Sequence, residues 1–209
     1  MLFDKKSVIV FQGDSITDAL RGYEPEGLGH GYARMCIRAL ESLYPDYELV
    51  CYNRGISGNR IPDLAERWDE DCINLKPDLV SILIGVNDTW HSHGVGYFGG
   101  VSNEDFEIGY RNILEKTKKA GAKIILIEPF AFHHDAFKEE WRDGDFNTKI
   151  MITRKLAREY ADAFISLDGI YYANTVKYAP EELSEDGVHP TVLGHRILAK
   201  EWLKAAGAI

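Results

Sequence analysis

Residues 7–18 of the chain read SVIVFQGDSITD. The first five residues are mostly β-branched or apolar, which is typical of a buried strand over Ser7–Phe11. A turn sequence with a central serine, Gly13–Asp18, follows at once. Similar apolar runs recur along the chain, separated by helix-length segments. This alternation predicts a parallel sheet that is covered by helices on both faces.

The whole chain follows this strand-and-helix pattern. The strands are predicted at Ser7–Phe11, Tyr47–Tyr52, Leu79–Ile84, Lys123–Glu128 and Phe164–Leu167. The helices are predicted at Tyr32–Tyr44, Ile61–Asn74, Glu104–Ala120, Thr148–Tyr160 and Leu193–Ala206. No linker, repeat or low-complexity stretch divides the chain, so we expect one domain over residues 1–209. Two long loops, Gly85–Asn103 and Pro129–Phe146, begin at carboxyl ends of strands, where ligands bind in sheets of this class.

Composition restricts the classes of partner. The chain has 209 residues, 45% of them apolar, and a formal net charge of −9, without the basic clusters that nucleic acids and anionic membranes recruit. The longest mainly apolar stretch, Leu79–Val86, is far below the roughly 20 residues of a membrane-spanning helix. The apolar run that starts at Val8 is too short for a signal peptide. The spacing of Cys36, Cys51 and Cys72 matches neither a disulfide framework nor a metal site, so we expect a cytoplasmic protein.

Two motifs far apart in the sequence carry the groups of a nucleophilic site. Ser15 directly follows the first predicted strand, and Asp186 stands three residues before His189, just ahead of the last helix. The carboxylate can orient the imidazole, which can then take the serine proton, as in a Ser-His-Asp triad. Taken singly, each motif has another interpretation: Ser15 as a helix N-cap, and the second motif as an Asp-Gly turn with a surface histidine.

Two further strand ends carry hydrogen-bond donors. Gly58 lies in the loop after the second predicted strand and Asn87 in the loop after the third. A glycine N–H and an asparagine amide can stabilise the oxyanion of an acyl-transfer reaction, although both residue types also occur in ordinary turns. The joint occurrence of these motifs in order at strand ends has a chance probability of roughly 10⁻⁴.

The same residues carry a resemblance to the SGNH hydrolases of the GDSL esterase superfamily, through four motifs that span positions 13 to 190. The resemblance implies a flavodoxin-like three-layer α/β/α sandwich with a five-stranded parallel sheet. It also implies a serine nucleophile, a triad and an oxyanion hole, and no cofactor. These roles fall on Ser15, Asp186 and His189 for the triad, and on Ser15, Gly58 and Asn87 for the oxyanion hole. Ile16 stands where the superfamily's name has leucine.

Within that superfamily the chain is most similar to intracellular acetyl-xylooligosaccharide esterases, through Gly55–Asn59, Arg67-Trp68, Lys76–Asp78 and Ile84–Trp90. This similarity implies removal of acetyl groups from small carbohydrates. We expect the substrate to contact Asp14, Trp90 and Phe130, where aromatic rings can stack on sugars or pack against one another.

Two alternative functions are compatible with parts of this pattern. A lysophospholipase or thioesterase would share the catalytic motifs, and a non-catalytic glycan-binding module would share the fold. A homo-oligomer is compatible with either. Residues 94–99 match G-x-G-x-x-G but do not directly follow a strand, which disfavours a dinucleotide site. No metal is expected, because the loop histidines and the nearby aspartate lack ligand spacing: His91, His93, His133, His134 and Asp135.

Overall fold

A parallel sheet forms the centre of the computed structural model, which describes residues 1–93, 99–132 and 136–209. The strand order is β2-β1-β3-β4-β5, and Val10 of β1 pairs with both Tyr52 and Val80. The strands are β1 (Val8–Gly13), β2 (Val50–Asn53), β3 (Leu79–Leu83), β4 (Lys123–Ile127) and β5 (Ala163–Ile165). The order is that of flavodoxin-like folds. The predicted five-stranded parallel sheet is confirmed.

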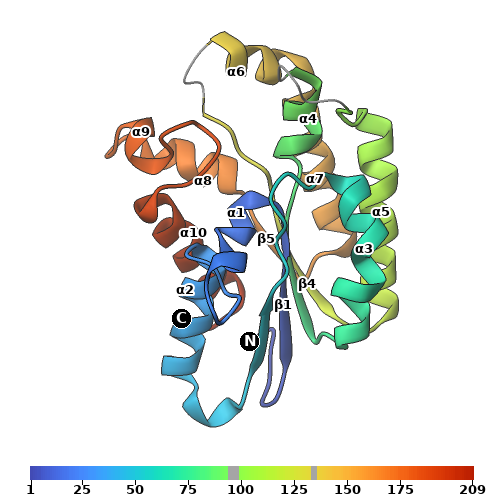
Figure 1. Cartoon of the computed structure of the whole chain (residues 1–209), viewed down its shortest axis with the longest axis vertical. Coiled ribbons are helices and arrows are strands. Elements are labelled where there is room, and N and C mark those ends of the chain that lie inside the picture. The colour runs from blue at the N-terminus through green and yellow to red at the C-terminus, as the bar shows by residue number, and fades with distance from the viewer. Residues whose placement is uncertain (94–98, 133–135) are drawn as a thin grey trace.

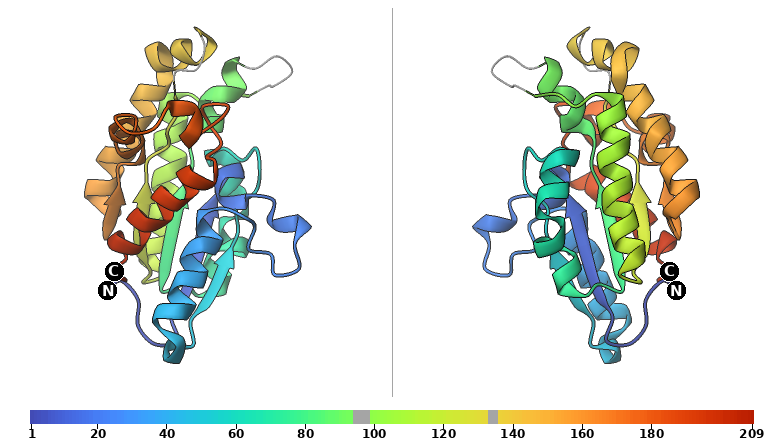
Figure 2. Two further views of the ribbon diagram at one scale, coloured as in Figure 1. Left: turned by 90° about the vertical axis from the view of Figure 1, so that its left-hand side faces the viewer. Right: turned by 90° about the vertical axis from the view of Figure 1, so that its right-hand side faces the viewer.

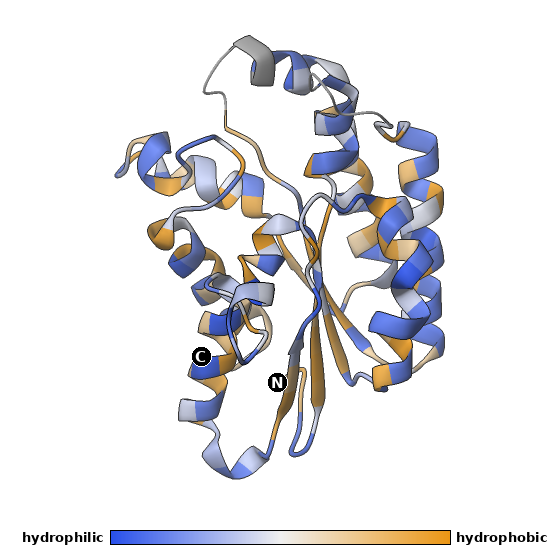
Figure 3. Ribbon diagram, in the orientation of Figure 1, coloured by the Kyte–Doolittle hydropathy of each residue, from blue (hydrophilic) through white to orange (hydrophobic). Residues whose placement is uncertain are grey.

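Helices cover both faces of this sheet (Figure 2). One face carries α2 (Tyr32–Leu43), α8 (Leu167–Asn174) and α10 (Val192–Ala205). The other carries α3 (Ile61–Asp71), α5 (Asn103–Lys119) and α7 (Asn147–Tyr160). Figure 3 shows that the strands are mainly hydrophobic. Their side chains alternate between the two layers, so both faces of the sheet are covered by apolar core. The structure is therefore the expected three-layer α/β/α sandwich.

Strand β3 illustrates how one strand serves both layers. Leu79 and Leu83 belong to the apolar core under α2 and α10, whereas Val80 and Ile82 belong to the core under α3, α5 and α7. Successive side chains of a strand point to opposite faces, so a strand buried on both sides is mainly apolar. Its one polar residue, Ser81, is buried and accepts a hydrogen bond from Trp202 Nε1 at 2.9 Å. The polar residues that follow such a strand are consequently concentrated at its end, where a ligand can reach them.

Several short helices lie in segments that the sequence pattern predicts as loops or strand. They are α1 (Ser15–Asp18), α4 (Val86–His93), α6 (Ala136–Trp141), the π-helical turn Arg142–Phe146 and α9 (Pro180–Leu183), with 3₁₀ turns at Arg21–Tyr23 and Pro45–Tyr47. The predicted helix Ile61–Asn74 ends earlier, at Asp71, and a 3₁₀ turn at Ile73–Leu75 follows it. Helix α4 buries the polar residues Asn87, Asp88 and Thr89, so it lacks the apolar stripe by which helices are predicted. The predicted last strand also ends too late, because Leu167 already begins α8.

Candidate active site

Ser15 stands at the point where β1 turns into α1, at the carboxyl edge of the sheet. Asp14 is the N-cap of α1, and its Oδ1 accepts the Ile16 N–H at 3.0 Å. A side chain at Gly13 would place its Cβ 2.3 Å from the Leu83 carbonyl oxygen, so only glycine fits there. The tight passage from strand to helix holds Ser15 above the end of β1.

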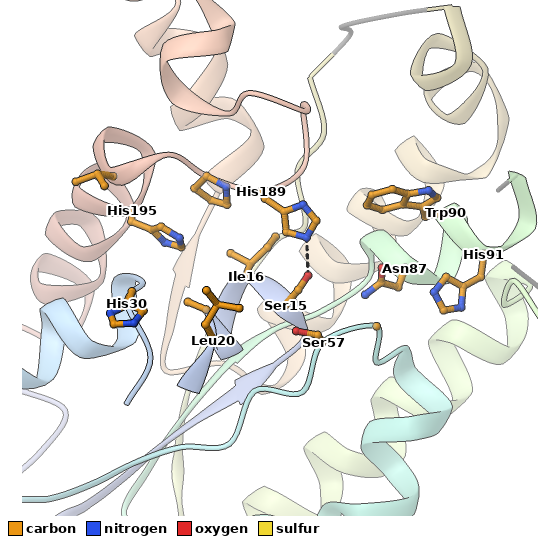
Figure 4. A pocket seen from close by; sticks show the side chains of 14 residues that line it. Ser15, Ile16, Leu20, His30, Ser57, Asn87, Trp90, His91, His189 and His195 are labelled. Carbon is orange, nitrogen blue, oxygen red and sulfur yellow. Dashed lines mark hydrogen bonds between the residues drawn. The ribbon is translucent and has the colours of Figure 1, made fainter. Parts of the chain in front are cut away.

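A chain of hydrogen bonds links Ser15 to two residues from the other end of the sequence. Ser15 Oγ lies 2.8 Å from His189 Nε2 (Figure 4), and His189 Nδ1 lies 2.6 Å from Asp186 Oδ2. The second carboxylate oxygen, Oδ1, accepts the backbone N–H groups of Val188 at 2.9 Å and His189 at 2.7 Å. Both oxygens of Asp186 are thus hydrogen-bonded, and the bond from Nδ1 to Oδ2 fixes the orientation of the His189 ring.

The electrostatics of the pair stabilise the imidazolium form of His189, and in the neutral ring they place the proton on Nδ1. Partial burial acts to raise the pKa of Asp186, but hydrogen bonds from the His189 ring and from two backbone N–H groups outweigh it and hold the pKa well below its usual value. The hydrogen bond to Asp186 raises the pKa of His189, against the opposing effect of burial. Because Nδ1–H donates to a carboxylate, Nε2 is free to accept the proton of Ser15.

Gly58, Asn87, Ser15 and His189 line one cavity. This cavity has a volume of about 570 Å³. Gly58 has a φ of +82°, a conformation that glycine adopts without strain. Asn87 is 5% exposed, and its Nδ2 donates to the Asn59 carbonyl oxygen at 3.0 Å. An amide nitrogen carries two hydrogens, so one of them remains for a ligand in the cavity. The structure therefore gathers every residue predicted for the oxyanion hole.

The loop that carries Gly58 is fixed by residues to which the sequence analysis gave no role. Asp18 Oδ2 accepts the N–H of Ser57 at 3.2 Å and its hydroxyl at 2.6 Å. Arg67 donates to Asn59 Oδ1 at 2.8 Å and to the Arg54 carbonyl oxygen at 2.9 Å. These partners are distant in the sequence, and no local pattern indicates them.

The three predicted substrate-contacting residues lie in different surroundings. Trp90 lines the cavity, with its ring centroid 6.0 Å from that of His189. Phe130 does not reach the cavity: it is 1% exposed and its ring centroid lies 4.5 Å from that of Tyr171 in the core. Asp14 is also 1% exposed and caps α1 instead of lining the cavity, and burial raises its pKa to about 7. Of the three residues, the structure thus brings Trp90 to the cavity and places Phe130 and Asp14 outside its lining.

The cavity extends past Ser15 to a side that the sequence analysis did not foresee. Figure 4 shows this side opposite Asn87, Trp90 and His91. It is lined by Ile16, Leu20, His30 and His195. Leu20 is 59% exposed, so the rim on this side is partly apolar.

Other expectations concern metals and membranes. Among the described residues, no group of three or more His, Cys, Asp or Glu side chains is arranged to hold a metal ion. His133, His134 and Asp135 lie outside the described residues, as does most of the G-x-G-x-x-G match at 94–99. Within the described ranges, no helix has the length and apolarity to cross a bilayer.

Comparison with known proteins agrees with this geometry. The model of the GDSL-like Lipase/Acylhydrolase family matches residues 11–197. The chain is 34% identical over 207 residues to an acetylxylan esterase of Geobacillus stearothermophilus, which covers 95% of this chain and 93% of that protein.

Solved structures show the same likeness. A GDSL-like protein from Parabacteroides merdae is 35% identical, with a TM-score of 0.91 and coverage of 99% of this chain and 98% of the other. The acetylxylan esterase of Geobacillus stearothermophilus is 31% identical, with a TM-score of 0.87 and coverage of 99% and 97%. Solved catalytic mutants of that esterase replace a serine, an aspartate or a histidine by alanine. The chain belongs to the GDSL-like lipase/acylhydrolase family and is a carboxylic ester hydrolase.

Proposed function

We propose that the protein is a serine esterase that removes acetyl groups from carbohydrates, with acetylated xylo-oligosaccharides as its substrate class. The observation that carries the proposal is the unbroken hydrogen-bonded series from Ser15 through His189 to Asp186, beside Gly58 and Asn87 in one cavity. The similarity to an acetylxylan esterase supports the choice of substrate.

In the first half of the reaction Ser15 becomes acetylated. Its Oγ attacks the acetyl carbonyl carbon while His189 Nε2 takes the hydroxyl proton, and Asp186 stabilises the imidazolium that forms. The carbonyl oxygen becomes an oxyanion, which the N–H groups of Ser15 and Gly58 and the Asn87 amide stabilise. When the intermediate collapses, the bond to the sugar oxygen breaks and His189 returns the proton to that oxygen.

In the second half a water molecule releases the acetyl group. His189 Nε2 takes a proton from the water as its oxygen attacks the acetyl carbon, and the same donors stabilise the second oxyanion. The ester bond to Ser15 then breaks, the proton passes to Ser15 Oγ, and acetic acid leaves as acetate. The net reaction consumes one water molecule and no cofactor takes part in it.

The substrate side of the proposal draws on the walls of the cavity. Trp90 presents an aromatic ring beside His189, where the sugar oxygen must receive its proton, and such a ring can stack on a sugar. The partner is thus a small acetylated carbohydrate. Cys36, Cys51 and Cys72 are all free thiols, which supports a reducing, cytoplasmic location.

A series of nitrophenyl esters of increasing acyl length, followed by acetylated xylo-oligosaccharides, tests the function. We expect the highest kcat/KM at acetate, and acetate release from the sugar ester. A preference for long acyl chains would favour a lysophospholipase or thioesterase, and no turnover by the folded protein would favour a glycan-binding module.

Replacing the nucleophile tests the mechanism. Ser15→Ala should stay folded, as judged by circular dichroism, and hydrolyse esters at a near-background rate. Ser166→Ala is the matched control, because Ser166 makes no capping bond at the start of α8 and does not line the cavity. Substantial turnover by Ser15→Ala would refute the assignment.

A further inference from the structure

His195 occupies the unassigned side of the cavity. It belongs to α10, and Figure 4 shows its ring directed from that helix toward Ile16 and Leu20. Its place is separated from Asn87 and Trp90 by the Ser15–His189 pair. A ligand that reaches from the reacting serine into this side of the cavity must therefore pass the His195 ring.

The ring of His195 is held in one orientation by the start of α2. Its Nδ1 accepts the N–H of Tyr32, the first residue of α2, at 3.1 Å. Gly31 allows this approach, because a Cβ at Gly31 would lie 2.9 Å from His195 Cε1 and 3.2 Å from Nδ1. The side chain thus caps a helix that offers no side-chain cap of its own.

This bond also fixes the tautomer. Because Nδ1 accepts a hydrogen bond, the proton of the neutral ring must be on Nε2. Burial, reinforced by the nearby charge of His189, lowers the pKa of His195 to about 4, so the ring is neutral at pH 7. Nε2–H has no hydrogen-bond partner among the described residues.

An acetyl group cannot use this donor. Its single polar atom is the carbonyl oxygen, which Ser15, Gly58 and Asn87 bind. The alcohol part of a sugar ester, in contrast, carries hydroxyl and ring oxygens that accept hydrogen bonds. A partly buried donor aimed into a cavity is satisfied by such an acceptor when the ligand is bound.

We propose that His195 is a specificity-determining residue whose Nε2–H donates to an oxygen of the sugar from which Ser15 takes the acetyl group. This inference rests on the proposed carbohydrate esterase function. His195 takes no part in proton transfer, which belongs to His189. Its two nitrogens have separate duties: Nδ1 holds the start of α2 and Nε2 recognises the sugar.

Two substitutions separate these duties. In His195→Asn, the amide oxygen can occupy the place of Nδ1 and accept the Tyr32 N–H, but no donor reaches the cavity. In His195→Gln, the amide can donate near the place of Nε2, but the Tyr32 N–H loses its acceptor. The melting temperature of each variant is measured. Its kcat/KM is measured for acetylated xylo-oligosaccharides and for nitrophenyl acetate.

We expect His195→Asn to keep its melting temperature and to lose about 3- to 10-fold in the ratio of the two kcat/KM values, sugar ester over nitrophenyl ester, as for one neutral hydrogen bond. His195→Gln should keep most of that ratio and melt at a lower temperature. A wild-type ratio in His195→Asn, or an equal loss of the ratio in both variants, would overturn the inference. Failure of the proposed function differs, because wild-type protein would then not hydrolyse the sugar ester.

Discussion

Asp186→Asn is expected to reverse the tautomer of His189. Oδ1 of Asp186 accepts two backbone N–H groups, at 2.9 and 2.7 Å, so the corresponding atom of asparagine must remain an oxygen. The amide nitrogen then faces His189 Nδ1, which lies 2.6 Å from the present Oδ2. Two N–H donors cannot face each other at that distance. His189 must therefore carry its proton on Nε2, where it can no longer accept the proton of Ser15.

The size of the loss follows from the two interactions that disappear. Restoring the active tautomer leaves a donor facing a donor, which costs about 1–3 kcal/mol. The imidazolium also loses a carboxylate about 4 Å from its centre, worth between about 1 kcal/mol in water and about 4 kcal/mol near a protein surface. Together these reach about 5 kcal/mol, or a decrease of about 10³- to 10⁴-fold in kcat.

The assay is kcat for nitrophenyl acetate as a function of pH. In the wild-type protein the neutral form of His189 is active and its pKa is raised, so activity should increase with pH along a limb above the usual histidine value of about 6.5. In Asp186→Asn this limb should move to lower pH. Glu185→Gln removes an equal charge from the adjacent exposed residue and should stay within about twofold of wild type. A kcat within tenfold of wild type in Asp186→Asn would show that Asp186 does not set the tautomer of His189.

Three further predictions concern the same cavity. Asn87→Ala should lower kcat by about 10²- to 10³-fold in steady-state assays with little change in KM, since it removes one oxyanion donor, and an unchanged kcat would exclude Asn87 from that role. In Gly58→Ala the added Cβ meets no atom within 4 Å, but alanine is strained at a φ of +82°. The free energy of unfolding measured in urea should therefore fall by about 1 kcal/mol, and a tilted N–H should lower kcat. Wild-type stability and kcat would contradict this. Prolonged treatment with a chelator should leave kcat/KM unchanged, and a loss that zinc reverses would contradict the scheme.

Sequence patterns predicted those parts of the fold and site that depend on local chemistry. The alternating strands and the position of Ser15 after β1 follow from short apolar runs and the turn residues behind them. The direction of a side chain beyond a strand end depends on tertiary packing and cannot be predicted from neighbouring residues in the sequence. Phe130, for example, packs in the core and does not line the cavity. His195 could not be found either, because its role depends on Tyr32, which lies 163 residues away.

The capping carboxyl group of Asp14 gives the protein an unusual relation between pH and heat stability. Asp14 and Asp88 are both fully covered, each has one oxygen without a hydrogen-bond partner among the described residues, and burial raises the pKa of each to about 7. An acid whose pKa is higher in the folded state binds more protons there than in the unfolded chain. Between about pH 4 and 7 the free energy of unfolding therefore falls as the pH rises.

Taken alone, each carboxyl group lowers the free energy of unfolding by about 4 kcal/mol over that interval, at 1.36 kcal/mol per pH unit. The two decreases are not simply additive, because the charge of Asp14 contributes to the raised pKa of Asp88. The raised pKa of His189 acts in the same direction. The lowered pKa of His195 acts in the opposite direction between about pH 4 and 6.5 and offsets part of the decrease from the two aspartates. Calorimetry should find a higher melting temperature at pH 5 than at pH 7.5, and Asp88→Asn should flatten the difference; the reverse order would contradict this. A rise in pH thus removes the proton from His189, which activates it as a base, and also ionises the buried carboxyl groups of Asp14 and Asp88. We therefore expect the highest activity at a pH where the melting temperature is already reduced.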